Sequence, residues 1–229
     1  MDTKAAIIEA VADLLARSPS GDVSTRAMCE AVGVQQPVLY RLFNDKDTLL
    51  AATVDHVWGK YLEVKRAAKE SDDPLEDLRA GWDSHTAFAL ANPNIYRLMF
   101  SPALRAKSEA AEEAMGILRG MLERLAVLGR LRVTPEVGAR MIMSANTGVA
   151  LALITHPAQY PDAGLSVLVR DAIHQAILLD SAAAVSAGDA RRAAATTLVA
   201  SLDGLTPEPF NAAEAGLLGH WLTQIAERR

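Results

Sequence analysis

The chain has 229 residues, of which half are hydrophobic and 22% are charged, so it is large enough for one or two globular domains with a real core. Its formal net charge of −5 and its pI near 5.6 exclude the global basic character of proteins that bind nucleic acids without sequence preference. The single cysteine permits no internal disulfide, and the segment MDTKAAIIEA carries acidic residues within its first apolar run, so we expect a cytoplasmic protein without a signal peptide.

Helical periodicity dominates the chain, while β-branched residues are sparse and alternating patterns are absent, so we expect an all-α fold. The apolar stripe of the first helix precedes the segment SPSGD and consists of Ile7, Ile8, Val11, Leu14 and Leu15. A second, short helix follows Ser24, whose side chain is suited to cap it, and Gly33 supplies the left-handed turn that ends it. A third helix begins at the two glutamines of GVQQPVLYRLF, because Pro37 is tolerated only in the first turn of a helix.

The rest of the chain is predicted to be helical as well, beginning with a long fourth helix from Asp45 or Lys46 to about Lys69. Breaks rich in proline, glycine and asparagine separate further helices at residues 75–91, 93–101, 104–129, 135–155, 165–182, 189–203 and 211–227. The stretch from Met141 to Pro161 lacks Asp, Glu, Lys and Arg, but its polar residues and two prolines indicate a buried helix and a loop rather than a membrane span.

The last of these helices has a recognisable start and an apolar stripe. Asn211 is followed three residues later by Glu214, a spacing that predicts a capping box. The stripe is predicted to face the core and consists of Leu217, Leu218, Trp221, Leu222 and Ile225.

The second and third helices are short and joined by a tight glycine turn, which predicts a helix-turn-helix unit. Cys29, four residues before Gly33, supplies the small buried residue needed where the two helices touch, so packing explains it better than redox chemistry. The other positions expected to be buried are Met28, Val32, Val34, Leu39 and Leu42. A generic helical hairpin would tolerate the same pattern, but the exposed face favours DNA binding. A recognition helix enters the major groove by its N-terminal end, where this chain has Gln35, Gln36 and Pro37.

Two stretches of the N-terminal segment carry a family resemblance: STRAMCEAVGVQQPVLY and the aromatic-containing LYRLFNDKDTLL. Over residues 4–50 the chain resembles the TetR family of transcriptional regulators. Over residues 51–229 the resemblance is architectural, supported by the segment NPNIYRLMF. It implies an N-terminal three-helix DNA-binding domain with a helix-turn-helix at residues 1–48. A larger helical effector-binding and dimerisation domain would follow at residues 49–229.

The resemblance implies that the third helix reads bases. Gln36 is the leading candidate, because a glutamine amide can pair with both N7 and N6 of adenine. Gln35 replaces the helix-capping serine that is usual in the family, which predicts a weaker cap and shifts base reading toward Gln36. Pro37 and Val38 would make apolar contacts, and the proline ring can pack on a thymine methyl group.

Other residues of the matching segment are expected to hold the DNA backbone, and contacts of that kind position a protein without specifying sequence. Thr25, Tyr40 and Lys46 would bind phosphates, although Tyr40 could instead be a packed aromatic and Lys46 a solvated lysine. Arg26 and Arg41 could reach either a phosphate or a guanine. The first fifty residues contain seven acidic and five basic residues, which argues against tight nonspecific binding but not against a specific dimer.

One helix-turn-helix contacts only a few base pairs, so useful specificity requires two copies. The resemblance implies a two-fold homodimer formed by two C-terminal helices per chain, here residues 135–155 and 165–182. The small residues that would let a neighbouring helix approach closely are Ala145, Gly148 and Ala152. Alternatively, these helices pack within the monomer. The helices at 189–203 and 211–227 either extend or cover the interface.

Between the fourth helix and the dimer helices, the resemblance implies a ligand cavity. Its expected wall is Trp58, Trp82, His85, Phe88, Tyr96, Met99, Phe100, Met115, Met121, Met143 and Asn146. Taken singly, each of these residues is better explained by core packing, but together they favour a small, mostly apolar effector, because methionine adapts to irregular apolar shapes. Asn146 could bond either the ligand or the dimer partner.

No pattern in the sequence favours an enzyme. The five histidines show no metal-ligand spacing, and we find no phosphate-binding glycine loop, nucleophile elbow or catalytic pair of carboxylates. We therefore expect no catalytic residue, no metal and no cofactor. The predicted function is a DNA-binding transcriptional regulator, a repressor that a small molecule releases from palindromic double-stranded operator DNA, without membrane contact. The alternative is a ligand-independent DNA-binding protein or an activator of the same fold.

Overall fold

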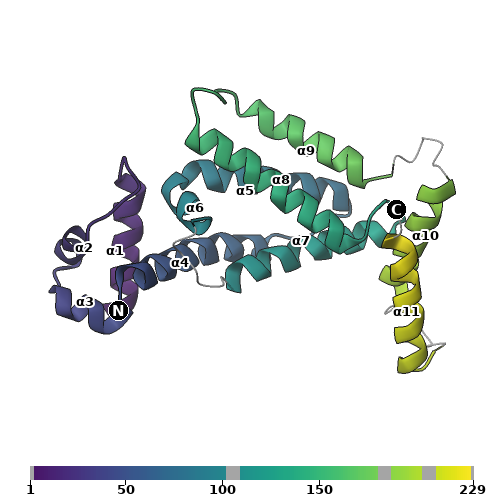
Figure 1. The fold of residues 1–229 in the computed structure, drawn as a ribbon, viewed down its shortest axis with the longest axis horizontal. Coiled ribbons are helices and arrows are strands. Elements are labelled where there is room, and N and C mark those ends of the chain that lie inside the picture. The colour runs from purple at the N-terminus through teal and green to yellow at the C-terminus, as the bar shows by residue number, and fades with distance from the viewer. Residues whose placement is uncertain (1–2, 102–108, 180–186, 203–209, 228–229) are drawn as a thin grey trace. The chain divides into compact units, whose positions relative to one another are not determined.

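The computed structural model describes residues 3–101, 109–179, 187–202 and 210–227 (Figure 1). The helices are α1 (Thr3–Arg17), α2 (Thr25–Val32), α3 (Gln36–Phe43), α4 (Lys46–Ala67), α5 (Pro74–Ala91), α6 (Pro93–Met99), α7 (Glu109–Val127), α8 (Pro135–Thr155), α9 (Gly164–Ile177), α10 (Ala187–Ser201) and α11 (Ala212–Glu227). Within the described ranges, β-type pairing is limited to an isolated bridge between Leu131 and Leu178. The predicted all-α fold is confirmed.

The chain packs into two compact units. The first unit consists of Met1–Lys69, Ala87–Ala114 and Leu151–Pro157, and the second of Glu70–Thr86, Met115–Ala150 and Ala158–Arg229. Helices α1 to α4 and α6 therefore belong to the first unit, and α9 to α11 belong to the second. The predicted boundary at residue 48 concerns function, between a DNA-binding and an effector-binding part, and it stays a prediction.

Helices α2 and α3 form the predicted helix-turn-helix in the first unit. Ser24 caps α2 by accepting a hydrogen bond from the Ala27 N–H at 3.1 Å. Gly33 adopts the left-handed conformation at φ 70°, and the Val34 N–H then bonds to the Cys29 carbonyl at 3.1 Å, which closes the turn. Cys29 is buried, as predicted. The common core around these helices is formed by Ile7, Val11, Leu15, Val23, Met28, Leu39, Phe43, Leu49 and Leu50.

The start of α3 follows from its sequence. Pro37 lies in the first turn, and the N-cap residue Gln35 has an extended backbone but makes no capping hydrogen bond with its side chain. The weaker cap predicted for Gln35 is therefore confirmed. The next helix has a strong cap, because the Asp45 carboxylate accepts a hydrogen bond from the Thr48 N–H at 2.7 Å. Helix α4 thus begins where the sequence predicted and continues to Ala67.

Helix α6 fastens the end of α1 within the first unit. The Asn94 side-chain amide donates hydrogen bonds to the carbonyls of Leu15 and Ser18, both at 2.7 Å. These carbonyls lie at the C-terminal end of α1, where backbone acceptors have no partner within the helix. Gly21, at φ 75°, passes so close that an added Cβ would lie 2.9 Å from atoms of Asn94 and Arg97. The loop SPSGD is therefore shaped by its contact with α6.

The second unit contains an apolar core with a small polar network inside it. The buried apolar residues are Leu78, Trp82, Leu122, Leu125, Ala126, Leu131, Ala139, Ile142, Val149 and Ile177. The Trp82 indole N–H donates to the Ser166 hydroxyl at 2.9 Å, and that hydroxyl lies 3.0 Å from the Thr86 hydroxyl. Asn146 completes the network from α8, because its amide donates to the Trp82 carbonyl at 3.1 Å and its oxygen lies 3.2 Å from the Thr86 hydroxyl.

Helix α8 has the length and apolar composition of a membrane span, with a mean hydropathy of 1.4 in its most apolar window. The core helix of a soluble protein has the same properties. Asn146 lies buried in the middle of α8, and its side-chain nitrogen and oxygen each form a hydrogen bond within the second unit. The predicted interpretation as a core helix therefore accounts for this segment.

Some predicted helix ends were wrong. Helix α6 ends at Met99 rather than at residue 101, and α7 ends at Val127, before the left-handed Gly129. The predicted start of α7 at residue 104 lies outside the described residues. Helix α9 ends at Ile177, five residues early, because the next residues pair with an extended strand-like segment. The Leu179 N–H bonds to the Arg130 carbonyl, and the Arg132 N–H bonds to the Ile177 carbonyl, both at 2.9 Å.

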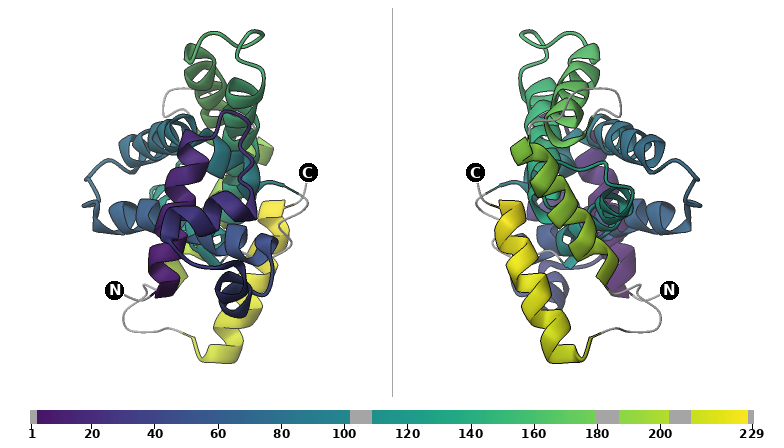
Figure 2. Two further views of the ribbon diagram at one scale, coloured as in Figure 1. Left: turned by 90° about the vertical axis from the view of Figure 1, so that its left-hand side faces the viewer. Right: turned by 90° about the vertical axis from the view of Figure 1, so that its right-hand side faces the viewer.

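Helices α10 and α11 lie side by side (Figure 2). The capping box of α11 is confirmed, because Asn211 accepts hydrogen bonds from the N–H groups of Ala213 and Glu214 while its own N–H donates to the Glu214 carboxylate. The predicted core stripe was wrong at three of its five positions. The exposed large side chains of α11 are Leu217, Trp221 and Ile225, with Trp221 55% exposed. Leu218 and Leu222 are half-buried, and the buried position is Ala226.

Candidate nucleic-acid interface

The N-terminal ends of α2 and α3 carry the residues predicted to contact DNA. Gln35, Gln36 and Pro37 are exposed at the start of α3, and Arg41 is exposed about one turn later. Val38 is half-buried. The helix therefore presents amide groups and an apolar ring to solvent at the end that a recognition helix places in the groove.

The side chain of Gln36 makes a weak contact with Tyr40 of the same helix. Its side-chain amide donates to the Tyr40 hydroxyl one turn later, at 3.4 Å. This distance exceeds that of a well-formed hydrogen bond, so the contact is weak and easily exchanged. Tyr40 itself is an exposed aromatic residue, with its ring on the same face of α3 as Gln36.

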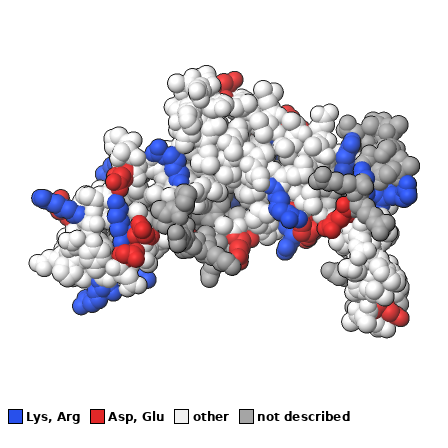
Figure 3. Space-filling model, viewed as in Figure 1, with Lys and Arg blue, Asp and Glu red and all other residues white. Residues whose placement is uncertain are grey.

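Two of the cations predicted to bind DNA are held by acidic residues of the first unit. The Lys46 ammonium group lies 2.7 Å from the Asp22 carboxylate, and the Arg26 guanidinium lies 2.7 Å from the Glu30 carboxylate. The Lys46 hydrogen bond lowers the pKa of Asp22 below its ordinary value. Figure 3 shows acidic and basic side chains interspersed at the end of the molecule that carries α1 to α3. A DNA phosphate would have to replace these carboxylates, which limits nonspecific affinity.

The two acidic partners differ in how readily the sequence reveals them. Glu30 stands four residues after Arg26 on one helix, a spacing at which opposite charges pair. Asp22 and Lys46 are 24 residues apart, in the loop before α2 and at the start of α4. Only the folded structure brings that pair together. Thr25, the remaining predicted phosphate contact, is half-buried as the first residue of α2.

Residues 7–53 match the family model described as bacterial regulatory proteins, tetR family. The N-terminal segment is therefore similar to the DNA-binding domain of that family. The match runs from α1 into α4, so all nine residues predicted to contact DNA lie inside it. The matched segment contains the helix-turn-helix formed by α2 and α3.

Curated relatives include the nucleoid occlusion factor SlmA of Marinomonas sp. (strain MWYL1), which is 26% identical over 109 residues, 47% of this chain and 55% of that protein. SlmA of Vibrio vulnificus (strain YJ016) is 26% identical over 119 residues, 51% of this chain and 61% of that protein. The chain thus spans little more than half the length of the curated relatives it matches.

Solved structures share the fold at low sequence identity. The fatty acid degradation regulator FadR from Bacillus halodurans has a TM-score of 0.58 and 17% identity, covering 76% of this chain and 94% of FadR. NalD, the secondary repressor of the MexAB-OprM multidrug efflux pump in Pseudomonas aeruginosa, has a TM-score of 0.54 and 18% identity, covering 78% of this chain and 96% of NalD. Each of these structures therefore leaves more than a fifth of this chain without a counterpart.

The residues predicted to bind an effector are distributed over both units. In the first unit, Trp58 and Phe88 form an aromatic cluster with Tyr61, with ring centroids 4.7 to 4.9 Å apart. The Trp58 indole N–H donates to the Ala110 carbonyl at 3.1 Å, so this side chain is anchored at its polar end too. The sequence prediction missed Tyr61, although it stands three residues after Trp58 and thus on the same face of α4.

Helix α6 supplies the other effector-wall residues of the first unit. Tyr96 is fully buried, and its ring centroid lies 5.1 Å from that of Phe100, which is partly exposed. Met99 packs against the core that also holds α1 and α4. The helix that fastens the end of α1 therefore also carries two of the predicted effector contacts, and Phe100 directly follows it.

The second unit holds the remaining predicted effector residues. Trp82, His85 and Asn146 are buried, and Asn146 and Trp82 are bonded to each other through the polar network. Met115 and Met121 pack against the apolar core, and Met143 is half-buried on α8. Because these residues belong to a different unit from Trp58, their assembly into one cavity with it stays a prediction.

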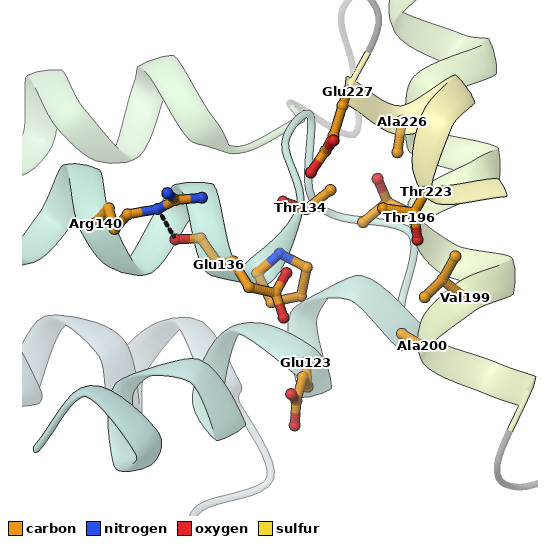
Figure 4. A pocket seen from close by; sticks show the side chains of 11 residues that line it. Glu123, Thr134, Glu136, Arg140, Thr196, Val199, Ala200, Thr223, Ala226 and Glu227 are labelled. Atoms are coloured by element: carbon orange, nitrogen blue, oxygen red, sulfur yellow. Dashed lines mark hydrogen bonds between the residues drawn. The ribbon is translucent and has the colours of Figure 1, made fainter. Parts of the chain in front are cut away.

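A cavity of about 450 Å³ in the second unit was not anticipated (Figure 4). Its lining comes from the end of α7, the start of α8 and the two C-terminal helices. Glu123, Glu136 and Glu227 contribute carboxylates, Arg140 contributes a guanidinium group, and Thr196 contributes a buried hydroxyl without a hydrogen-bond partner among the described residues. None of the predicted effector residues lines it. The sequence could not reveal it, because the cavity depends on where α10 and α11 pack.

Proposed function

We propose that this protein is a TetR-family repressor that binds a palindromic operator as a homodimer and is released by a small, mostly apolar ligand. The observation that carries the proposal is the start of α3, where an exposed glutamine precedes a proline and carries no strong internal hydrogen bond. A glutamine in that position can form two hydrogen bonds with an adenine edge in the major groove.

In this account, residues around Gln36 have distinct roles. Pro37 and Val38 would contact thymine methyl groups, and Gln35 would lie beside the neighbouring base pair. Contacts with the DNA backbone come from two hydroxyl groups and three basic side chains, those of Thr25, Tyr40, Arg26, Arg41 and Lys46. Of the three basic side chains, Arg41 forms no ion pair among the described residues. Arg41 can therefore bind a phosphate without displacing a carboxylate.

Dimerisation is proposed to use one face of α8 and one of α9. Leu168 is 70% exposed on α9, and the neighbouring Val167 is also an exposed apolar residue. On α8, an added Cβ at Gly148 would meet no atom within 4 Å, so this position is open to a neighbouring helix. Ala145 packs partly against the core of its own unit, which moves the proposed contact toward Gly148. The proposed interface would bury the exposed leucine and use the small residue for close helix approach.

Ligand control is proposed to act through α4 and α6. Helix α4 begins at Lys46, beside the DNA-binding surface, and Trp58 is part of the same uninterrupted helix. Helix α6 carries Tyr96 and holds the end of α1 through Asn94. A ligand that binds more tightly when these two helices shift must weaken DNA binding by the same factor, because coupling between two sites is reciprocal. A coupling of about 1–3 kcal/mol would release the operator roughly 5–150-fold.

A second candidate is a DNA-binding regulator that needs no ligand. The close contacts among Trp58, Tyr61 and Phe88 favour it, because rings that fill their own surroundings leave less room for a small molecule. The two candidates predict the same operator binding and differ only in its control.

The test begins with selection of an operator from random double-stranded DNA by the full-length protein. Compounds that raise the melting temperature are then assayed for their effect on operator affinity. An inverted repeat as the selected site, and a stabilising compound that weakens its binding, are the expected results. If no inverted repeat is selected, the proposed dimeric repressor is wrong. If every stabilising compound leaves DNA affinity unchanged, the ligand-independent candidate replaces the ligand-controlled one.

A further inference from the structure

A second cavity of the second unit has a lining suited to an anion. It measures about 410 Å³ and lies where the start of α5, the connection between α7 and α8, and the end of α9 meet. Its apolar lining comes from Leu75, Leu178 and Leu179. None of the predicted effector residues contributes to it, so it requires an explanation of its own.

His174 is a buried polar side chain of this cavity that lacks hydrogen bonds. It is 5% exposed, and both of its ring nitrogens are buried without a partner among the described residues. Its ring contacts Trp82 edge to face, with 6.2 Å between centroids. Burial and the nearby Arg170 and Arg79 lower the pKa of His174 to about 4, so the ring is neutral near pH 7 and offers one N–H donor and one acceptor.

Two guanidinium groups line the same cavity, those of Arg79 from α5 and Arg130 from the connection between α7 and α8. Neither forms an ion pair with a described residue. The carboxylate in the lining, that of Asp171, is held by Arg170 at 3.0 Å, and Arg170 also binds Asp83 at 2.8 Å. The lining therefore combines two unpaired cations and an unpaired N–H donor with one carboxylate that already has a partner.

We infer that this cavity binds a small carboxylate with an apolar body. Guanidinium groups match the planar geometry of a carboxylate and bind it with paired hydrogen bonds. The His174 N–H would supply a further donor, and the three leucines would cover a short hydrocarbon chain or a ring. The cavity volume lies within the usual range of small-molecule sites. The inference does not depend on operator control, since it concerns binding alone.

Isothermal titration calorimetry of the full-length protein with octanoate tests the inference. Octylamine and octanol have the same hydrocarbon chain with a different head group and serve as comparison ligands. Octanoate should bind, while the amine and the alcohol should bind at least about tenfold more weakly, because they lack the charge that the arginines recognise. Arg79→Gln and Arg130→Gln should each weaken octanoate binding about tenfold or more. Arg119→Gln, on α7 and paired with Glu123, is the matched control and should leave it unchanged.

His174→Phe separates a binding role from a structural one. A ring of similar shape without polar atoms should keep or raise the melting temperature of the free protein, since it removes two unpaired buried atoms. The same variant should weaken octanoate binding. The inference is overturned if octanoate does not bind, if the alcohol binds equally well, or if the arginine variants bind as the control does. Equal binding of inorganic phosphate would overturn the requirement for an apolar body.

Discussion

Two regions of the first unit differ in the contacts that their side chains make. One is the surface formed by α2 and α3, and the other is the aromatic cluster of Trp58, Tyr61 and Phe88. On the surface, each of two cations is paired with one exposed carboxylate, and Gln36 makes one weak contact. Such exposed pairs contribute about 0–1 kcal/mol to stability and exchange partners readily. In the cluster, each ring contacts the other two, and Trp58 is also anchored to a carbonyl.

This difference determines which contacts each region can exchange while the protein stays folded. The surface can exchange carboxylates for phosphates, so single substitutions there should alter DNA binding and leave the fold intact. A ligand entering the aromatic cluster must replace close-packed contacts, so it has to supply equivalent ones. Operator recognition is therefore the more easily altered property, and effector specificity is the more strongly tied to stability.

The largest effect is expected at the aromatic cluster. Trp58→Ala should reduce the free energy of unfolding by about 3–5 kcal/mol, because it removes a buried ring and leaves a cavity. Chemical denaturation measures this change. Gln36→Ala, on the surface, is the comparison and should change stability by less than about 0.5 kcal/mol. Equal effects of the two substitutions would remove the contrast between the regions.

His174 in the second unit provides a test by pH. Its pKa is lowered from 6.5 to about 4, first by burial and then by Arg170 and Arg79, with Asp171 and Asp83 opposing. As the pH falls through this interval, the unfolded chain binds a proton that the folded chain does not, so the unfolding free energy decreases, by about 2–4 kcal/mol from this group. The His174→Phe variant should lack this part of the decrease in unfolding free energy. Identical pH profiles of the two proteins by chemical denaturation would contradict the burial of a neutral imidazole.

The proposed dimer face gives the next effect in size. Leu168→Glu should produce monomers and lower operator affinity about 100-fold, because a single helix-turn-helix contacts only a few base pairs. Val64→Glu is a matched control, since Val64 is 71% exposed on α4 and Leu168 is 70% exposed on α9. Light scattering measures the oligomeric state. A wild-type monomer at micromolar concentration, or a dimeric Leu168→Glu variant, would contradict the proposed interface.

The smallest effect is expected from the acidic partner of Lys46. Asp22→Asn should free the ammonium group for a phosphate and strengthen binding to all DNA sequences alike, by about threefold. The slope of binding against salt should become steeper by about one unit, and Lys46→Ala should weaken all sequences equally. Asp13→Asn, which removes the partner of Arg17, is the control. Unchanged binding by Asp22→Asn would mean that Lys46 does not reach the DNA.

The local features of the helix-turn-helix could be predicted because each depends on neighbouring residues. Ser24 caps α2 and Gly33 turns left-handed through interactions that span three to five residues. Pro37 restricts where α3 begins. The residues that form this surface could therefore be predicted from the sequence. The ion pair between Asp22 and Lys46 could not, because it joins residues 24 positions apart.

The errors arise where a distant segment decides the outcome. The apolar stripe of α11 predicts that Trp221 is buried, but α10 covers another face of the helix, and periodicity does not reveal which face finds a partner. The end of α9 depends on hydrogen bonds with residues near Arg130. The cavity beside His174 likewise brings together residues from three separate segments, and no local pattern marks it.

The most direct test of sequence-specific DNA recognition by α3 is a comparison of Gln36→Ala with wild type on the selected operator and on variants of each base pair in one half-site. Gln159→Ala, which removes an exposed glutamine from a loop, is the control. We predict that Gln36→Ala loses about 1–3 kcal/mol of binding free energy on the operator and relaxes the preference at one base pair per half-site. Unchanged affinity together with an unchanged base preference would contradict the assignment of Gln36 as the base-reading residue.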